Sequence, residues 1–221
     1  MGVNRGRHQC PLCHGHFVSD YHFDQTRSYL HCSTCSLVFV PSDQQLSRAD
    51  EKAVYDLHQN ASDDGGYRKF LSRLTAPLGE RLKPQSQGLD FGCGPGPTLS
   101  VMMEEQGHKM ALYDVYYADY PQALEQQYDF ITSTEVVEHL ANPGRELDRL
   151  WALTLPGGYL GLMTKLVKDQ HSFASWHYKN DPTHISFFSV ATFNYLAELW
   201  NANIEFFGAD VIIFRKWHHG L

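Results

Sequence analysis

The alternation of apolar and polar positions divides the chain into three stretches. From residue 87 onward, short apolar runs alternate with helical stretches, as in a mostly parallel sheet that is covered on both faces. Residues 42–86 show apolar residues at helical spacing, whereas residues 1–41 are rich in turn-forming residues, Cys and His. We therefore predict a small N-terminal unit at 1–41, a helical lead-in at 42–86 and a main domain at 87–221.

The main domain is predicted to be an α/β fold with six strands. The apolar runs place the strands at 89–91, 110–113, 130–133, 159–163, 204–207 and 211–214. Helices are expected at 98–106, from Asn142 and Pro143 onward, and at 191–200. The last two strands are close enough to pair as an antiparallel hairpin. Only about 15 residues separate Asp114 from the next strand, so one strand-helix unit is expected to be shortened or missing.

The lead-in is predicted to contain two helices. Ser47, with Asp50 three residues later, is typical of a helix start. The second helix has Tyr67, Phe70, Leu71, Leu74 and Leu78 at helical spacing. Pro77 lies within that pattern and is expected to kink or split the second helix, because proline lacks the amide hydrogen that helical bonding needs.

Size and charge narrow the classes of function. The 221 residues, 43% of them hydrophobic, suffice for one sizeable core and a small appendage. The net charge of -7 disfavours nucleic acid as a partner, because phosphate binding requires a positive field. The apolar runs are too short to span a membrane, and residues 1–10 have no apolar core like that of a signal peptide. We expect a cytoplasmic protein that does not insert into membranes.

Four of the five cysteines form two CxxC pairs. Cys10 and Cys13 are separated by 18 residues from Cys32 and Cys35, a spacing typical of a four-thiolate zinc site. Two disulfides are the alternative, but they are rare in a reducing compartment. With four thiolates, zinc has no open position for water, so the predicted metal in this zinc ribbon is structural.

A glycine-rich turn lies between the first predicted strand and the helix that follows it. The run Asp90-Phe91-Gly92-Cys93-Gly94-Pro95-Gly96 allows the backbone to approach a nucleotide-like ligand. A dinucleotide fingerprint requires glycine at position 97, which is Pro97 here, and this weakens a nicotinamide assignment. Asp114 ends the second strand, where a carboxylate can accept hydrogen bonds from ribose hydroxyls. Cys93 is expected to be a packed residue rather than a nucleophile.

Four segments, in this order along the chain, resemble the class I S-adenosylmethionine-dependent methyltransferases. They are GLDFGCGPG at 88–96, the acidic Asp114, YDFITSTEVVEHL at 128–140 and LPGGYL at 155–160. The resemblance covers roughly residues 87–214 and implies a Rossmann-like fold with S-adenosylmethionine as cofactor. It implies that the cofactor is held by Asp90, Gly92, Gly94, Gly96 and Asp114, and that Thr134 and Glu135 border the methyl-transfer cavity. The segment after Asp114 departs from the family pattern, so no adenine-contacting residue is assigned.

Methyl transfer to a hydroxyl or carbon acid also requires a base, and histidine is the natural choice near neutral pH. His184 lies in a polar and aromatic segment after the strand predicted at 159–163 and is a candidate base, with a buried structural histidine as the alternative. His139 is a second candidate, for which a local structural or cofactor-side role is favoured. Tyr55 and His58 are candidates for covering the cofactor.

The segment around His184 resembles that of zinc-ribbon sugar C-methyltransferases, which carry glutamate where this chain has Thr183. That departure puts sugar C-methylation in doubt. No Asn/Asp-Pro-Pro-Tyr-like run follows the strand near Ser133, which disfavours methylation of amide or adenine nitrogen.

The sequence therefore predicts methyl transfer from S-adenosylmethionine to a small-molecule oxygen, nitrogen or carbon. One alternative is a zinc-ribbon module that binds protein or RNA beside a catalytically silent Rossmann domain. The other, a nicotinamide oxidoreductase, is disfavoured by Pro97.

Overall fold

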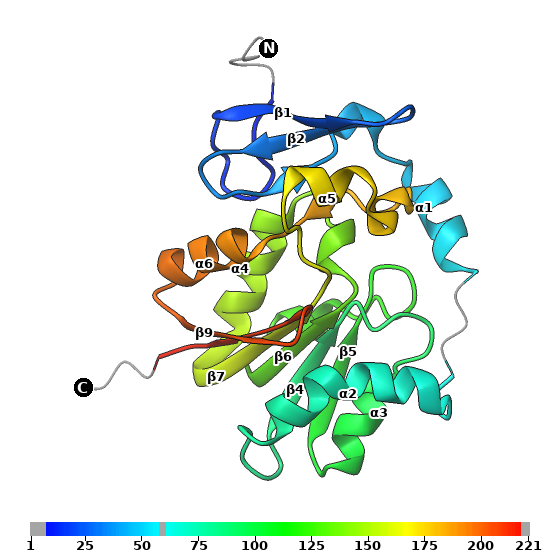
Figure 1. Ribbon diagram of the computed structural model, residues 1–221. Helices are drawn as coiled ribbons and strands as arrows, with labels where there is room; N and C mark the ends of the chain where they lie inside the picture. The colour runs from blue at the N-terminus through cyan, green and yellow to red at the C-terminus, as the bar shows by residue number, and fades with distance from the viewer. Residues whose placement is uncertain (1–7, 58–60, 218–221) are drawn as a thin grey trace.

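The computed structural model describes residues 8–57 and 61–217, and its centre is a six-stranded sheet (Figure 1). The strand order is β5–β4–β6–β7–β10–β9. The strands are β4 (Gln87–Phe91), β5 (Lys109–Tyr113), β6 (Tyr128–Thr134), β7 (Thr154–Met163), β9 (Asn203–Phe207) and β10 (Val211–Arg215). Strands β5, β4, β6 and β7 are parallel to one another, and β10 and β9 continue the sheet as an antiparallel hairpin. The predicted α/β class and its C-terminal hairpin are confirmed.

The chain between β5 and β6 forms no strand in the described part of the structure beyond an isolated bridge. The 3₁₀ turn η2 (Pro121–Leu124) lies there, together with a single backbone pairing between Asp114 and Ala118. Asp114 and Ala118 exchange two backbone hydrogen bonds of 3.0 Å. The predicted shortening of one strand-helix unit is confirmed, and β5 consequently ends the sheet on that side.

Helices cover both faces of the sheet. On one face, α2 (Gly65–Gly79) and α3 (Thr98–Glu105) pack through leucine and methionine side chains against Phe130 and Met163. On the other face, α4 (Pro143–Leu153) and α6 (Val190–Leu199) pack against the strand side chains that point away from α2 and α3. Phe130 and Ile131 lie on different faces because successive strand side chains alternate, and both are fully buried. This double coverage explains why the strands read as apolar runs in the sequence.

The first lead-in helix begins where the sequence predicts, but the predicted split of the second helix at Pro77 is wrong. Helix α1 (Arg48–Tyr55) starts at Ser47, whose hydroxyl accepts a hydrogen bond from the Asp50 amide. Helix α2 runs without interruption through Pro77 to Gly79. Pro77 lies in the last turn, where it removes only one helical hydrogen bond near the end. The buried Leu74 and Leu78 on either side hold that turn against the sheet.

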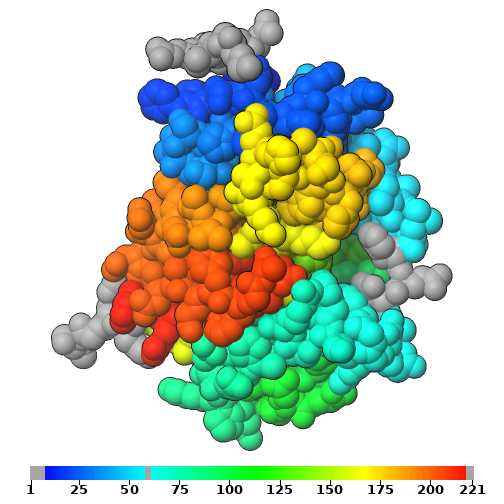
Figure 2. Space-filling model, viewed as in Figure 1, coloured from blue at the N-terminus to red at the C-terminus, as the bar shows by residue number. Residues whose placement is uncertain are grey.

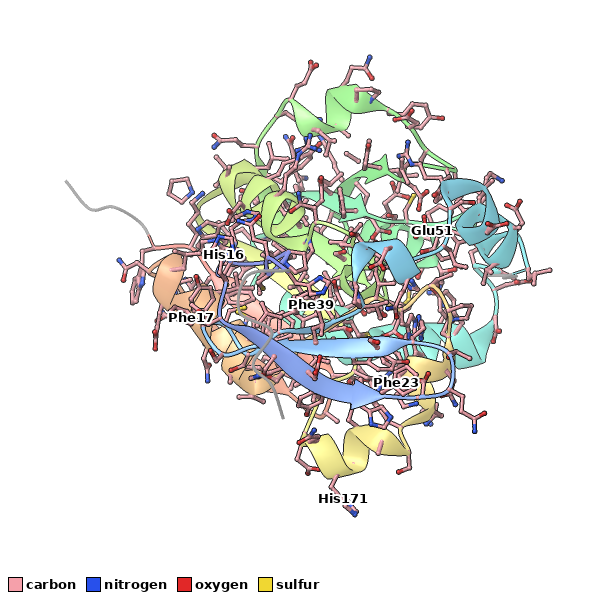
Figure 3. All side chains as sticks on the ribbon, turned by 90° about the horizontal axis from the view of Figure 1, so that it is seen from above. His16, Phe17, Phe23, Phe39, Glu51 and His171 are labelled. Atoms are coloured by element: carbon pink, nitrogen blue, oxygen red, sulfur yellow. The ribbon has the colours of Figure 1, made fainter. Side chains whose placement is uncertain are left out.

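A second sheet forms the N-terminal ribbon and includes a strand from much later in the chain. Strands β1 (Val18–Phe23), β2 (Ser28–Cys32) and β3 (Val38–Phe39) pair antiparallel in that order, and β8 (Ser186–Phe187) pairs with β3. Figure 3 looks down on this ribbon and shows the β1–β2 hairpin lying across the molecule, with Phe23 near its turn. The ribbon is therefore joined to the main domain by backbone pairing.

The segment that precedes β8 fills the space beneath the ribbon. It contains the short helix α5 (Gln170–Ala174) and the 3₁₀ turn η4 (His177–Asn180), and its yellow atoms in Figure 2 lie directly below the blue hairpin. The Phe173 ring, buried at the centre, contacts the rings of Tyr21 and Tyr29 from the ribbon. The remaining 3₁₀ turns are η1 (Ser42–Gln44) and η3 (Val137–His139). No helix among residues 8–57 and 61–217 is both long and apolar enough to cross a bilayer.

Candidate functional site

A cavity of about 900 Å³ opens at the edge where the parallel strands β4, β5 and β6 end. This edge is where α/β sheets bind their ligands, and the volume is in the range of small-molecule sites. One wall is the glycine-rich turn after β4, and the opposite wall is the segment 181–185 that leads into β8. All seven residues predicted to surround the cofactor line this cavity: Asp90, Gly92, Gly94, Gly96, Asp114, Thr134 and Glu135. Their roles in binding stay predictions.

The backbone of the turn after β4 requires glycine. Gly92 and Gly94 have φ angles of +78° and +65°, a backbone region that residues other than glycine rarely adopt. A Cβ atom on Gly92 would lie 2.4 Å from a methyl carbon of Val136. The absence of side chains here leaves the backbone open to the cavity.

Asp114 lies against this turn, as the sequence predicts. Its Oδ2 accepts a hydrogen bond of 3.0 Å from the Gly94 amide, and its Oδ1 accepts bonds from the amides of Tyr116 and Tyr117. The carboxylate is therefore held in one orientation at the cavity wall. Oδ2 keeps acceptor capacity, because each carboxylate oxygen offers about two lone-pair sites and only Oδ1 already accepts two bonds.

Asp90 is a buried carboxyl at the base of the cavity, 2% exposed. Its oxygens accept hydrogen bonds from the hydroxyls of Ser100 (3.0 Å) and Thr132 (3.2 Å). Burial raises the pKa of Asp90 from 3.8 to about 6, because the charged form loses its hydration, and the two hydroxyls only partly offset this.

We expect Asp90→Asn to remove a decline in stability with rising pH. A folded-state pKa above the unfolded value stabilises the fold fully below pH 3.8, and this contribution is lost as pH rises through about 6. A change from 3.8 to about 6 corresponds to about 3 kcal/mol at most. Urea unfolding at pH 4.5 and pH 7.5 should show a smaller difference for the variant than for the wild type. Equal differences in the two proteins would contradict the assignment.

Two further carboxyls follow β6. Glu135 has the left-handed φ of +53°, which places its side chain at the cavity wall. Burial, and next the nearby Glu138, raise the pKa of Glu135 to about 8, and burial raises that of Glu138 to about 7. Oε1 of Glu138 accepts a hydrogen bond from the Tyr178 hydroxyl. Within the described residues, Glu138 Oε2 and Glu135 Oε1 have no hydrogen-bond partner.

The two histidines predicted as catalytic lie side by side on the wall opposite the glycine turn. Their ring centroids are 4.7 Å apart, and both rings line the cavity. Nδ1 of His184 donates to the Tyr178 carbonyl (2.6 Å), and Nδ1 of His139 donates to the Thr183 carbonyl (3.2 Å). A carbonyl only accepts hydrogen bonds, so these contacts assign the proton to Nδ1 in each neutral ring.

His184 is both a buried, hydrogen-bonded histidine and a residue of the cavity wall, and its role as a base stays a prediction. It is 8% exposed. Burial, and next the neighbouring His139, lower the pKa of His184 to about 4, while the carboxylate of Asp181 acts in the opposite direction. The ring is therefore neutral at pH 7, with the lone pair on Nε2.

Arg27, at the turn of the β1–β2 hairpin, holds the backbone of this wall. Its guanidinium donates to four carbonyl oxygens, those of Lys179, Asp181, Pro182 and His184. Beside it, Asp24 pairs with the buried Lys179 ammonium at 3.1 Å. Arg27 is not predictable from the sequence, since no motif marks a contact with residues about 150 positions away.

Three other candidates are located as follows. Tyr55 lines the cavity, and its ring contacts that of His139 edge to face. His58 lies outside the described residues. Burial raises the pKa of the Cys93 thiol to about 12, so it is protonated at neutral pH, consistent with a packed residue rather than a nucleophile.

The four paired cysteines converge in the ribbon. The Sγ atoms of Cys10 and Cys35 are 3.5 Å apart, as are those of Cys13 and Cys32, and all four lie within 4.8 Å of one another. Four thiolates around zinc with bonds of about 2.3 Å have sulfur atoms roughly 3.8 Å apart. The cysteine cluster fits a tetrahedral zinc ion.

Comparison with known proteins shows a likeness to methyltransferases in sequence and in fold. A family model described as a methyltransferase domain matches residues 64–205. Among curated proteins, none matches the chain in sequence.

The fold matches solved structures at low sequence identity. One is the Burkholderia thailandensis 1,6-didemethyltoxoflavin-N1-methyltransferase with bound 1,6-didemethyltoxoflavin and S-adenosylhomocysteine. It is 16% identical, with a TM-score of 0.53, and the match covers 90% of this chain and 99% of that one. A putative sarcosine dimethylglycine methyltransferase from Galdieria sulphuraria matches at 12% identity and a TM-score of 0.52, over 76% and 98% of the two chains. The complex of the Haloferax volcanii Trm112 methyltransferase activator with a putative methyltransferase matches at 10% and 0.51, over 78% and 100%.

Proposed function

The chain belongs to the methyltransferase-domain family, and from this premise we propose that it transfers the methyl group of S-adenosylmethionine to a small-molecule acceptor. The transfer is an in-line displacement in which the bond from sulfur to the methyl carbon breaks as the bond from acceptor to methyl forms. The observation that carries the proposal is one cavity with two different walls. The glycine turn and Asp114 form one wall, and His139, His184 and Asp181 form the other.

The first wall suits an adenosyl cofactor. Gly92, Gly94 and Gly96 in the turn present backbone without side chains, and Oδ2 of Asp114 beside the turn offers an acceptor to ribose hydroxyls. Thr134 and Glu135 lie where β6 ends, between the two walls. The protein matched in Burkholderia has S-adenosylhomocysteine bound on the same fold, which supports this choice over nicotinamide.

The second wall, formed by His139, His184 and Asp181 and called the acceptor wall below, suits the acceptor. His139 and His184 line this wall, where they can act on the acceptor, whose proton must leave as the methyl group arrives. An oxygen, nitrogen or carbon acceptor is compatible with this wall. Substrates named for the matched structures belong to those proteins.

Calorimetric titration tests the cofactor assignment. We expect S-adenosylmethionine to bind at micromolar strength and NAD not to bind. Asp114→Asn should weaken binding about tenfold, because the amide nitrogen cannot accept a hydrogen bond from ribose. The matched control is Asp119→Asn, an exposed carboxyl of the same loop that does not line the cavity. Preferential binding of NAD, or equal affinity in both variants, would contradict the assignment.

Turnover separates this proposal from a silent domain whose ribbon binds protein or RNA. Incubation of the protein with methyl-labelled S-adenosylmethionine and a small-metabolite extract should yield a labelled small molecule. Label on protein or RNA alone, or no label despite cofactor binding, would favour the alternative.

We further propose that the four cysteines hold structural zinc. Four thiolates saturate a tetrahedral ion, so the metal supplies stability and no activated water. The ribbon so stabilised would keep Arg27 against the acceptor wall. The division into a ribbon at 1–41, a lead-in at 42–86 and a catalytic domain at 87–221 stays a prediction.

A further inference from the structure

The acceptor wall contains a second cluster of metal-binding side chains, remote in sequence from the cysteines. Glu138, His139 and His184 each present one ligand atom, and these atoms lie within 4.8 Å of one another. We propose that the three residues bind one divalent transition-metal cation in the cavity.

Both histidines are oriented as metal ligands usually are. In each ring Nδ1 donates to a backbone carbonyl, of Tyr178 for His184 and of Thr183 for His139. This arrangement fixes the tautomer and leaves the lone pair on Nε2, and a hydrogen bond of this kind from the non-ligating nitrogen is a regular feature of metal-bound histidine. The accepting carbonyls belong to the 178–184 segment that Arg27 holds in part, so the ring orientations are imposed by the fold.

Glu138 supplies the charge that a cation would neutralise. Glu138 is 1% exposed, and Tyr178 bonds one carboxyl oxygen while the other, Oε2, has no hydrogen-bond partner in the part of the chain that the structure describes. None of the ion pairs among the described residues includes Glu138. A buried carboxylate oxygen without a partner is costly unless something binds it, and a cation beside two imidazole nitrogens would do so.

The ligand set and its surroundings indicate the class of metal. Two imidazoles and one carboxylate suit borderline cations such as Fe²⁺, Co²⁺ or Zn²⁺ more than Mg²⁺ or Ca²⁺, which prefer oxygen ligands alone. Three protein ligands leave further coordination positions, and His139 and His184 line the open cavity. Asp181 Oδ2 lies 3.8 Å from Nε2 of His184 and adds negative charge near those positions.

Such a cation would bind an oxygen of the acceptor and favour its deprotonation. Only this catalytic role rests on the proposed methyl transfer, because binding of the cation stands on the cluster itself.

Metal content tests the site without any knowledge of the acceptor. The chelator-treated chain of 221 residues is loaded with Co²⁺, freed of excess metal by gel filtration and assayed by mass spectrometry. We expect two equivalents per chain in the wild type, one in the ribbon and one in the cavity. Glu138→Gln and His139→Asn should each retain one. The control His177→Asn, an exposed histidine outside the cluster, should retain two.

The ribbon provides an internal measure of folding. Co²⁺ bound to thiolates has a strong sulfur-to-metal absorption band, which the variants must keep if they are folded. If Glu138→Gln loses this band, His139→Asn provides the test, because His139 is only half-buried and its replacement disturbs the fold less. One equivalent in the wild type, or two in the folded His139→Asn variant, would overturn the site. Failure of methyl transfer instead appears as absence of S-adenosylmethionine binding in a protein that still holds two equivalents.

Discussion

Replacing Arg27 with alanine is expected to loosen the acceptor wall and lower the free energy of unfolding by about 4 kcal/mol. The guanidinium donates to four carbonyls of the 179–184 segment, and a hydrogen bond to a charged group contributes about 1.5–3 kcal/mol. The loss is smaller than the sum of four bonds because water replaces part of them at this half-buried side chain. Amide hydrogen exchange in the segment should rise at least tenfold.

Two further variants separate this effect from a loss of charge. Arg27→Lys retains the charge, but a single ammonium cannot reach all four carbonyls, so an intermediate loss is expected. Lys69→Ala removes an exposed charge on α2 and should leave both unfolding and exchange unchanged. Exchange that rises uniformly over the chain in Arg27→Ala, rather than in 179–184, would show that the arginine has no specific hold on this wall.

Gly144→Ala is expected to cost at least 3 kcal/mol, because it pushes the ribbon away from the main domain. Gly144 is in the first turn of α4, and its amide donates to the Pro11 carbonyl in the first cysteine knuckle. A Cβ atom there would lie 2.2 Å from the Leu12 carbonyl oxygen. The overlap is with backbone of the loop between Cys10 and Cys13, so no side-chain rotation relieves it.

The chain offers a matched control in Gly65, which is also in the first turn of a helix. No atom lies within 4 Å of a Cβ built on Gly65, so Gly65→Ala should be neutral or stabilising by up to about 1 kcal/mol. Urea unfolding of the two variants gives the comparison. Similar free energies of unfolding for both would mean that the ribbon and α4 can separate without cost.

The features that the sequence predicted correctly depend on residues close together in the chain. The order of strands and helices follows from local periodicity, and the helix start at Ser47 follows from one side chain and one amide three residues later. The glycine turn and Asp114 end neighbouring strands, and carboxyl ends of parallel strands meet at one edge. The cysteines form two local knuckles, so their convergence was predictable from spacing.

The continuity of α2 through Pro77 shows the limit of such local rules. Proline does tend to interrupt helices. Here the packing of Leu74 and Leu78 against the sheet outweighs the one helical hydrogen bond that Pro77 cannot donate. Glu138 illustrates the same limit, because its place in the VVEHL segment does not reveal that its carboxyl is buried beside His184.

What the amino-acid sequence by itself determined is the α/β class with its C-terminal hairpin, the candidate cofactor wall and the cysteine cluster. Only the tertiary structure decided how the acceptor wall is built. There β8 joins the ribbon sheet, Arg27 reaches carbonyls more than 150 residues away, and His139 meets His184. The reason is physical: periodicity and spacing record which face of an element is buried, whereas contacts between distant segments depend on how whole elements pack.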